Sequence, residues 1–182
     1  MVPASRPAWP KEHIARMLVQ YEITHPLAVV AIRGYYRDSM GAVGKNDRGI
    51  YDDAFFVFSS NVFASFNGNC DPSRYRPGIA TLRTGIHWYR RGNHGISKPG
   101  GGYPAFRPAN AQEALPVDRD GIVNPRPGVA INIHRGGRNS TSSEGCQTIH
   151  PDQWAAFYAL VSGEMTRNSV KTFPLLLIEA NG

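Results

Sequence analysis

A cysteine and a histidine lie close together in the segment from Ile131 to Trp154, INIHRGGRNSTSSEGCQTIHPDQW. His134 precedes Cys146 by twelve positions, and small polar residues fill most of the interval. A cysteine acts as a nucleophile when a base takes its proton and N–H groups stabilise the oxyanion of the attacked carbonyl. The pattern therefore indicates acyl transfer by Cys146 with His134 as base. Spacing alone also fits a small buried cysteine near a structural histidine.

Gly145 stands directly before the cysteine. A residue without Cβ allows close approach of the backbone to a substrate oxygen, so we expect the amides of Gly145 and Cys146 to form an oxyanion hole. The loop RGGRNSTSS is expected to bring base and nucleophile together.

The elements that must position this site are mostly strands. AVVAIRGYY and DDAFFVFSSNVFASFNG are rich in β-branched and aromatic residues and predict strands, with a hairpin near Ser59 to Asn61. GIATLRTGIHWYRRG predicts another strand, and NHGISKPGGGYP predicts a loop because it is rich in Gly and Pro. Asp120 and Gly121 predict a turn. GVAINIH is expected to be the strand that delivers His134, and FPLLLIEA a buried final strand.

Two helices are expected beside these strands. The first covers Lys11 to about Glu22, and the second begins at Pro151, a residue favoured in the first helical turn. Apolar residues recur at helical spacing in both segments. They are Ile14, Met17, Leu18 and Tyr21 in the first, and Trp154, Phe157, Tyr158 and Val161 in the second. The prediction is a mainly β chain of 182 residues, a single domain with an irregular arm over residues 1–10.

Composition and charge limit the partners. Hydrophobic residues make up 41% and charged residues 19%, as in globular proteins, and no window has the roughly 18 apolar residues of a membrane span. The net charge is +6, with 16 Arg against 4 Lys, which fits an anionic polymer as partner. The arginines are scattered and no nucleic-acid motif is present, so we expect no nucleic-acid binding. No oligomeric state is predicted.

The segment after Met1 lacks the apolar stretch of a secretory signal. The other cysteine, Cys70, has no histidine nearby in the sequence and is expected to be a spectator. A disulfide between Cys70 and Cys146 would silence the nucleophile, so that activity would require a reductant.

The order strand, His134, polar loop, Ser-x-Gly-Cys, short strand, helix and final strand resembles the YkuD-type L,D-transpeptidase catalytic domain. INIHRGG is similar to the family's strand ending in histidine, and SSEGCQTI to its Ser/Thr-His-Gly-Cys motif. The likeness covers Val129 to about Ile178. It implies a β-sandwich of two curved sheets, an N-terminal helix and a helix after the catalytic cysteine.

The resemblance also implies a reaction and a substrate, the peptidoglycan stem peptide. Cys146 would attack the carbonyl between an L-centre and a D-residue to form a thioester, with His134 moving the proton. A carbonyl at Arg135 or Gly136 would orient the histidine. Attack of an amine on the thioester would then give a cross-linked or exchanged product. Attack of water would give carboxypeptidase or endopeptidase activity. No cofactor or metal is expected.

Three features of the sequence depart from the family's pattern. Glu144 replaces its second histidine, Gln147 and Thr148 replace a basic residue, and Arg135 replaces a glycine. A carboxylate beside the thiol raises its pKa unless it is paired, for which Arg135 and Arg138 are candidates. The departures favour a lytic or exchange enzyme.

The remaining substrate-contact candidates lie around the thiol and on the upstream strand. They are Glu144, Ser143, Arg138 and Gln147, with His87, Trp88 and Tyr103. Action in the bacterial wall without an evident signal would suit a phage endolysin or an interbacterial effector.

Two alternatives remain open. A zinc-dependent amidase or peptidase would use two or three histidines and a carboxylate, although no HExxH motif is present. Its candidate ligands are His87, His94, Asp118 and His134. A non-catalytic envelope-binding module would use exposed aromatic and Arg side chains. Its candidates are Trp88, Tyr89, Tyr103, Arg90 and Arg91.

Overall fold

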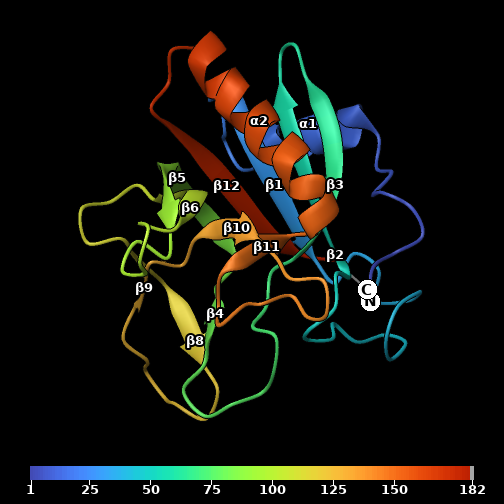
Figure 1. Cartoon of the computed structure of the whole chain (residues 1–182). Helices are drawn as coiled ribbons and strands as arrows, with labels where there is room; N and C mark the ends of the chain where they lie inside the picture. Colours follow the sequence, from blue (N-terminus) through green and yellow to red (C-terminus); the bar gives the residue numbers. More distant parts are fainter. Residues whose placement is uncertain (181–182) are drawn as a thin grey trace.

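The computed structural model describes residues 1–180 and is mainly β with two α-helices (Figure 1). The helices are α1 (Lys11–Gln20) and α2 (Pro151–Arg167). The strands are β1 (Leu27–Arg33), β2 (Asp53–Ser59), β3 (Phe63–Asn69), β4 (Ala80–Leu82), β5 (Gly85–His94), β6 (Tyr103–Pro108), β7 (Ala114–Leu115), β8 (Val117–Arg119), β9 (Gly128–Val129), β10 (Ile133–Arg135), β11 (Gln147–Ile149) and β12 (Thr172–Glu179). The predicted mainly β class with two helices is confirmed. Residues 1–10 contain neither helix nor strand.

Eight strands join into one closed sheet in the order β1, β12, β5, β6, β10, β11, β3, β2. Two smaller sheets pair β4 with β8 and β7 with β9. The two curved sheets expected from the resemblance are thus connected edge to edge. The connection arises because β10 pairs with β6 and β11 pairs with β3, so the two short site strands link the longer ones.

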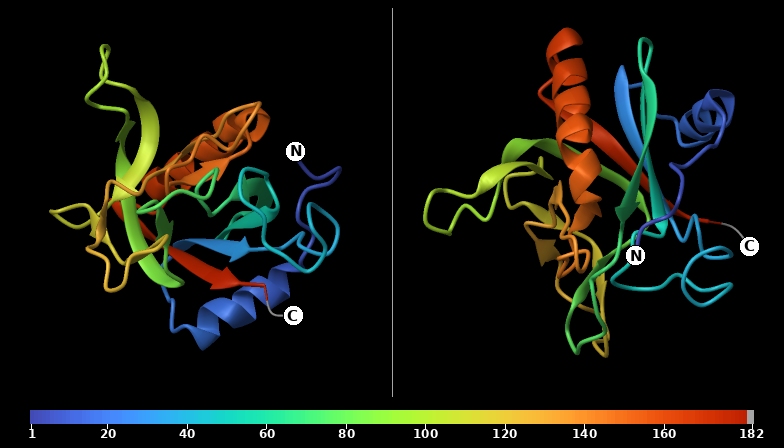
Figure 2. Two further views of the ribbon diagram at one scale, coloured as in Figure 1. Left: turned by 90° about the horizontal axis from the view of Figure 1, so that it is seen from below. Right: turned by 45° about the vertical axis from the view of Figure 1, so that its right-hand side comes forward.

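Strand β1 is buried along its whole length because a helix covers each of its faces. Val29 and Ala31 belong to the larger core, which includes the buried face of α2. Val30 and Ile32 point the other way and pack in a second core with α1. The left view of Figure 2 shows the two helices on opposite sides of β1 and β12. The continuous apolar run of this strand is explained by burial on both faces.

Three strand predictions differ from the structure. The segment GIATLRTGIHWYRRG forms two strands, β4 and β5. In NHGISKPGGGYP only residues 95–102 form a loop, because β5 continues through His94 and β6 begins at Tyr103. GVAINIH is interrupted between β9 and β10, where Ala130 has φ of +55°. The interruption matters because it shapes the backbone beside the cysteine.

In residues 1–180 no helix has the length and apolar character needed to cross a membrane.

Candidate active site

Cys146 lies at the end of a tight turn that leads into β11. The Ser143 hydroxyl accepts a hydrogen bond from the Gly145 amide at 3.0 Å and donates one to the Cys146 carbonyl at 2.7 Å. Gly145 has φ of +125°, and a Cβ there would lie 2.7 Å from the Ala80 carbonyl oxygen. The glycine is therefore needed for close approach of β4, and Ser143 shapes the turn.

This geometry corrects the predicted oxyanion hole. The Gly145 amide is already bound to Ser143 and cannot also serve a substrate. Among residues 1–180 the Cys146 amide has no hydrogen-bond acceptor, so it remains available. One of the two predicted donors is left.

Parallel pairing of β10 and β11 brings the histidine to the cysteine. Ile133 pairs with Gln147 and His134 with Thr148. Extending this register back by one residue places Cys146 beside Asn132, and residues two apart in a strand share a face. Cys146, Asn132 and His134 therefore point to the same side. The backbone N–H of Asn132 donates a hydrogen bond to the Cys146 Sγ at 3.3 Å.

The backbone after the histidine sets its tautomer. Nδ1 of His134 lies 2.8 Å from the Arg135 carbonyl oxygen and 3.0 Å from the Tyr103 hydroxyl, which also donates to that carbonyl at 3.2 Å. Because a carbonyl only accepts, Nδ1 carries the proton and Nε2 keeps a free lone pair. This is the orienting role predicted for Arg135 or Gly136, with Arg135 as the residue so placed.

His94, at the end of β5, lies against the proposed base. The His94 and His134 rings stack with centroids 3.8 Å apart and planes inclined by 19°. The Asn132 side-chain nitrogen lies 3.2 Å from Nδ1 of His94. A ring nitrogen of His94, a ring nitrogen of His134 and the Cys146 Sγ all lie within 4.8 Å of one another. From the sequence His94 was a candidate only for the alternative zinc site.

Both reactive groups are neutral at rest. Burial, together with the adjacent His94 ring, lowers the pKa of His134 to about 3. Burial raises the pKa of the Cys146 thiol to about 11, although the Asn132 amide and Arg107 act in the opposite direction. The thiol side chain is nonetheless partly exposed. The pair therefore resembles a neutral nucleophile and neutral base, in which the proton moves during attack.

Arg107 lies near the thiol although no sequence pattern predicted it there. It is 8% exposed, and its Nε donates to Glu113 Oε1 at 2.7 Å. Glu113 also accepts the Ala130 amide through its carbonyl, at 2.9 Å, and the Ala130 carbonyl lies 3.6 Å from the Cys146 Sγ. Arg107 thus supplies positive charge near the thiol while its partner holds the backbone beside it. No short motif marks this pair, because strand pairing brings it to the site.

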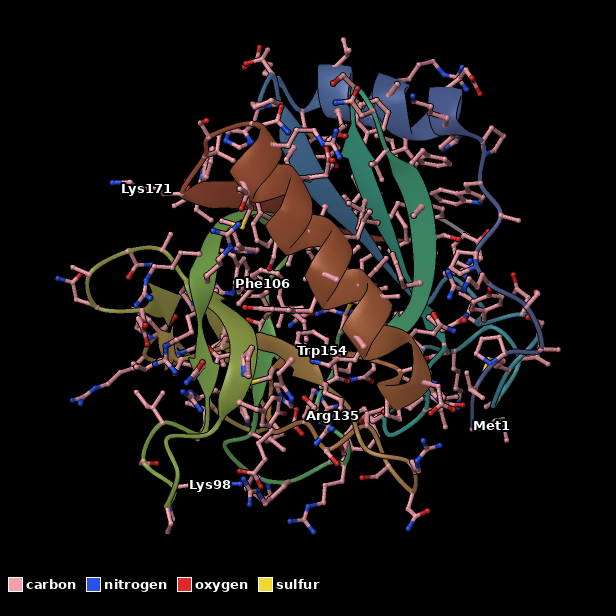
Figure 3. All side chains as sticks on the ribbon, turned by 45° about the horizontal axis from the view of Figure 1, so that its top comes forward. Met1, Lys98, Phe106, Arg135, Trp154 and Lys171 are labelled. Atoms are coloured by element: carbon pink, nitrogen blue, oxygen red, sulfur yellow. The ribbon has the colours of Figure 1, made fainter. Side chains whose placement is uncertain are left out.

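Arg135 and Lys98 lie at the same end of the molecule, with Lys98 on the loop between β5 and β6 (Figure 3). The guanidinium of Arg135 lies 5.2 Å from the centre of the Tyr103 ring. The positive charges of Lys98 and Arg135 both contribute to the low pKa of His134. This end of the molecule carries the exposed positive charge of the site.

Other predicted residues have different partners. Glu144 pairs with Arg76 at 3.2 Å, which corrects the expected pairing with Arg135 or Arg138. Arg138 instead donates to Asp152 at 3.2 Å, at the start of α2.

Gly136 and Gln147 are held within the protein. The Gly136 amide donates to the Ile149 carbonyl at 2.9 Å, and a Cβ there would overlap the Tyr51 hydroxyl. Gln147 is buried and donates to the Gly145 carbonyl at 3.3 Å. Both residues support the fold around the thiol.

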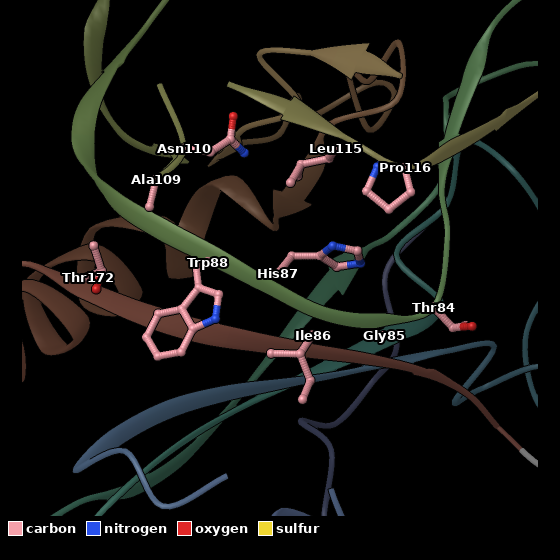
Figure 4. Close-up of a pocket in the computed structure, with 10 residues that line it drawn as sticks. All are labelled: Thr84, Gly85, Ile86, His87, Trp88, Ala109, Asn110, Leu115, Pro116 and Thr172. Carbon is pink, nitrogen blue, oxygen red and sulfur yellow. The ribbon is translucent and has the colours of Figure 1, made fainter. Parts of the chain in front are cut away.

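His87 and Trp88 do not join the thiol. They line a separate cavity of about 600 Å³ whose lining includes neither Cys146 nor His134 (Figure 4). His87 is buried, with Nε2 2.7 Å from the Arg83 carbonyl. Neither residue lies among the side chains around Cys146, because both are on β5 well before His94.

Of the alternative zinc ligands only His94 and His134 lie together, and the alternative aromatic platform lacks Tyr89. Asp118 pairs with Arg83 at 2.8 Å rather than with a histidine, and His87 also lies apart. Tyr89 is fully buried and donates to the Ile131 carbonyl, so it offers no surface for a glycan.

Both cysteines are free, and Cys70 is fully buried. The disulfide considered above is not formed.

A second group of buried charges surrounds Arg33 and shares no residue with the thiol site. Asp71 lies 3.2 Å from Arg33, while Asp53 accepts the Gly34 amide at 2.6 Å. Burial raises the pKa of Asp52 to about 7 and raises those of Asp53 and Asp71 as well. These three carboxyls outnumber the one guanidinium of this group, that of Arg33, so their titration bears on stability.

No family model, curated protein or solved structure matches this chain. The chemistry is therefore inferred from the site itself.

Proposed function

We propose that this protein is a cysteine enzyme that acts on peptidoglycan stem peptides by acyl transfer of the L,D-transpeptidase type. One observation carries the proposal: a partly exposed Cys146 thiol lies beside His134, whose Nδ1 is held by the Arg135 carbonyl. A nucleophile, a base and an orienting group, the three parts that acyl-transfer enzymes of this kind use, thus lie within one cluster.

The reaction follows from these positions. Sγ of Cys146 attacks the carbonyl between an L-centre and a D-residue while Nε2 of His134 takes the thiol proton. The free Cys146 amide donates to the oxyanion. The C–N bond then breaks, the proton passes from His134 to the leaving amine, and a thioester remains. An acceptor amine yields an exchanged or cross-linked product, and water yields the free acid.

A polar cavity beside the cysteine turn supports a peptide substrate. It has a volume of about 420 Å³. Its lining residues are Ser73, Arg74, Ser140, Ser142, Ser143 and Glu144. Its lining includes neither Cys146 nor His134, but Ser143 and Glu144 belong to the turn that directly precedes Cys146. Hydroxyl and guanidinium groups suit the amides and carboxylates of a stem peptide.

The test is mass spectrometry of muropeptides with tri- and tetrapeptide stems, cross-linked and not, after incubation with the purified protein. We expect loss or exchange of a terminal D-residue, or a change in a cross-link. Cys146→Ala should abolish it, and His134→Gln should slow it by about 10²–10⁴-fold.

Cys70→Ala is the matched control, because it removes the other thiol and leaves Cys146 in place. Circular dichroism establishes that each variant is folded. Unchanged muropeptides with the folded wild type would overturn the proposed substrate, and equal turnover by folded Cys146→Ala would overturn the thiol mechanism.

A further inference from the structure

His94, His134 and Cys146 form the cluster of ligand-type side chains that stands out among residues 1–180. One ligand atom from each lies within 4.8 Å of the others. Zn²⁺ binds imidazole nitrogen at about 2.0–2.1 Å and thiolate sulfur at about 2.3 Å, usually in a tetrahedron. Ligand atoms around such an ion are then roughly 3.5 Å apart. Closing the set around one ion therefore requires the three side chains to move towards one another from their present spread of up to 4.8 Å.

The surroundings of His134 match those of a metal-ligating histidine. Such histidines donate their second ring N–H to a carbonyl or carboxylate, which fixes the ring and its tautomer. Nδ1 of His134 makes this contact with the Arg135 carbonyl at 2.8 Å. Nε2 is left as the nitrogen that can bind an ion.

Asn132 can play the same part for His94. Its side-chain nitrogen lies 3.2 Å from Nδ1 of His94, and its buried Oδ1 has no hydrogen-bond partner among the described residues. Rotating the amide by half a turn would let Oδ1 accept the Nδ1 proton of His94. That rotation gives the buried Oδ1 of Asn132 a hydrogen-bond partner and leaves Nε2 of His94 free to bind an ion.

The chemistry of the three donors selects the ion. Two imidazoles and a thiolate suit zinc and copper, whereas Mg²⁺ and Ca²⁺ prefer oxygen ligands. His94 and Cys146 are both partly exposed, so an ion can reach the site and a water can complete a fourth position.

We propose that His94, His134 and Cys146 bind one Zn²⁺ and that the bound ion switches off the thiol. Binding replaces the Cys146 S–H bond by an S–Zn bond and releases the proton to solvent. The sulfur and the His134 nitrogen needed for acyl transfer are then both occupied. The inhibitory part rests on the proposed function, whereas the binding part does not.

Binding is tested on the whole chain after removal of metals with a chelator. Zn²⁺ affinity is measured by calorimetry, and Co²⁺ serves as a spectroscopic probe because thiolate ligation produces a charge-transfer band. We expect one ion per chain and a thiolate–cobalt band that Cys146→Ala removes. His94→Gln should weaken Zn²⁺ binding by more than the roughly 10–100-fold that loss of a supporting residue costs.

His13→Gln is the matched control, since it removes a histidine on α1 and should leave the affinity unchanged. Thermal melts without metal establish that the variants are folded. Absence of the cobalt band in the wild type, or equal Zn²⁺ affinity in folded His94→Gln, would overturn the site.

Inhibition by the ion is tested by measuring the alkylation rate of the Cys146 thiol. Stoichiometric Zn²⁺ should slow alkylation of Cys146 by iodoacetamide at least about 10-fold, and a chelator should restore it. Unchanged alkylation with Zn²⁺ bound would overturn the switch. Protection of the thiol in a protein that leaves every muropeptide unchanged would support this site while contradicting the proposed substrate.

Discussion

The His94 and His134 rings stack 3.8 Å apart although they come from different strands, β5 and β10. A protonated His134 would be buried against a second imidazole with the positive charge of Lys98 nearby. This contact favours the neutral ring, and a neutral His134 leaves the proton on the Cys146 thiol.

The first prediction concerns thiol reactivity against pH. Because the pKa of Cys146 is raised to about 11, we expect its alkylation by iodoacetamide to rise about tenfold per pH unit from pH 6 to 9. The measurement is the labelling rate of Cys146 followed by peptide mass spectrometry. A plateau within this range would contradict a neutral resting thiol.

The second prediction concerns the turn before the nucleophile. Ser143→Ala removes the bonds to the Gly145 amide and the Cys146 carbonyl, so we expect a loss of about 1–3 kcal/mol in unfolding free energy. Ser140→Ala is the comparison, since its exposed hydroxyl only accepts the Ser142 amide. Urea unfolding measures both, and equal effects would argue against the role of Ser143.

The third prediction concerns Gly145. Gly145→Ala forces a Cβ to within 2.7 Å of the Ala80 carbonyl oxygen at φ of +125°, so we expect it to destabilise the fold by several kcal/mol and to slow turnover. Gly121→Ala also has positive φ, +73°, but its Cβ would meet open space. It should cost only about 1 kcal/mol. Thermal melts of the two variants separate crowding from backbone strain.

The fourth prediction concerns the buried carboxyls near Arg33. The pKa of Asp52 is raised to about 7 in the folded state, so this residue's contribution to stability is complete below its unfolded pKa near 4. That contribution is lost as the pH rises towards 7. We therefore expect a lower unfolding free energy at pH 8 than at pH 5, by on the order of 1.4 kcal/mol per pKa unit at most.

Asp52→Asn should flatten this pH dependence, because an amide keeps an acceptor for the Asp47 amide without a titrating proton. Urea unfolding at both pH values measures the difference. An unchanged slope in the variant would show that the other buried carboxyls carry the effect.

Local patterns in the sequence were sufficient for the main elements. The apolar spacing from Lys11 and the proline at Pro151 predicted both helices, since an amphipathic helix needs only a stripe of apolar residues and a compatible start. The runs around β1, β2 and β3 predicted strands for the same local reason, and the hairpin between β2 and β3 is where it was expected. The closeness of Cys146 and His134 also followed from a short connection between adjacent elements.

The tertiary structure decided which residues complete the site. His94, Tyr103 and Arg107 reach it because β5, β6 and β10 lie side by side in the closed sheet. No local pattern encodes that pairing, since strand partners are chosen by packing over the whole chain. His87, seven positions before His94 on the same strand, lines a separate cavity because an extended strand advances about 3.3 Å per residue. The residue types and their order along the chain predicted the kind of chemistry, and the strand pairing determined which side chains surround the thiol.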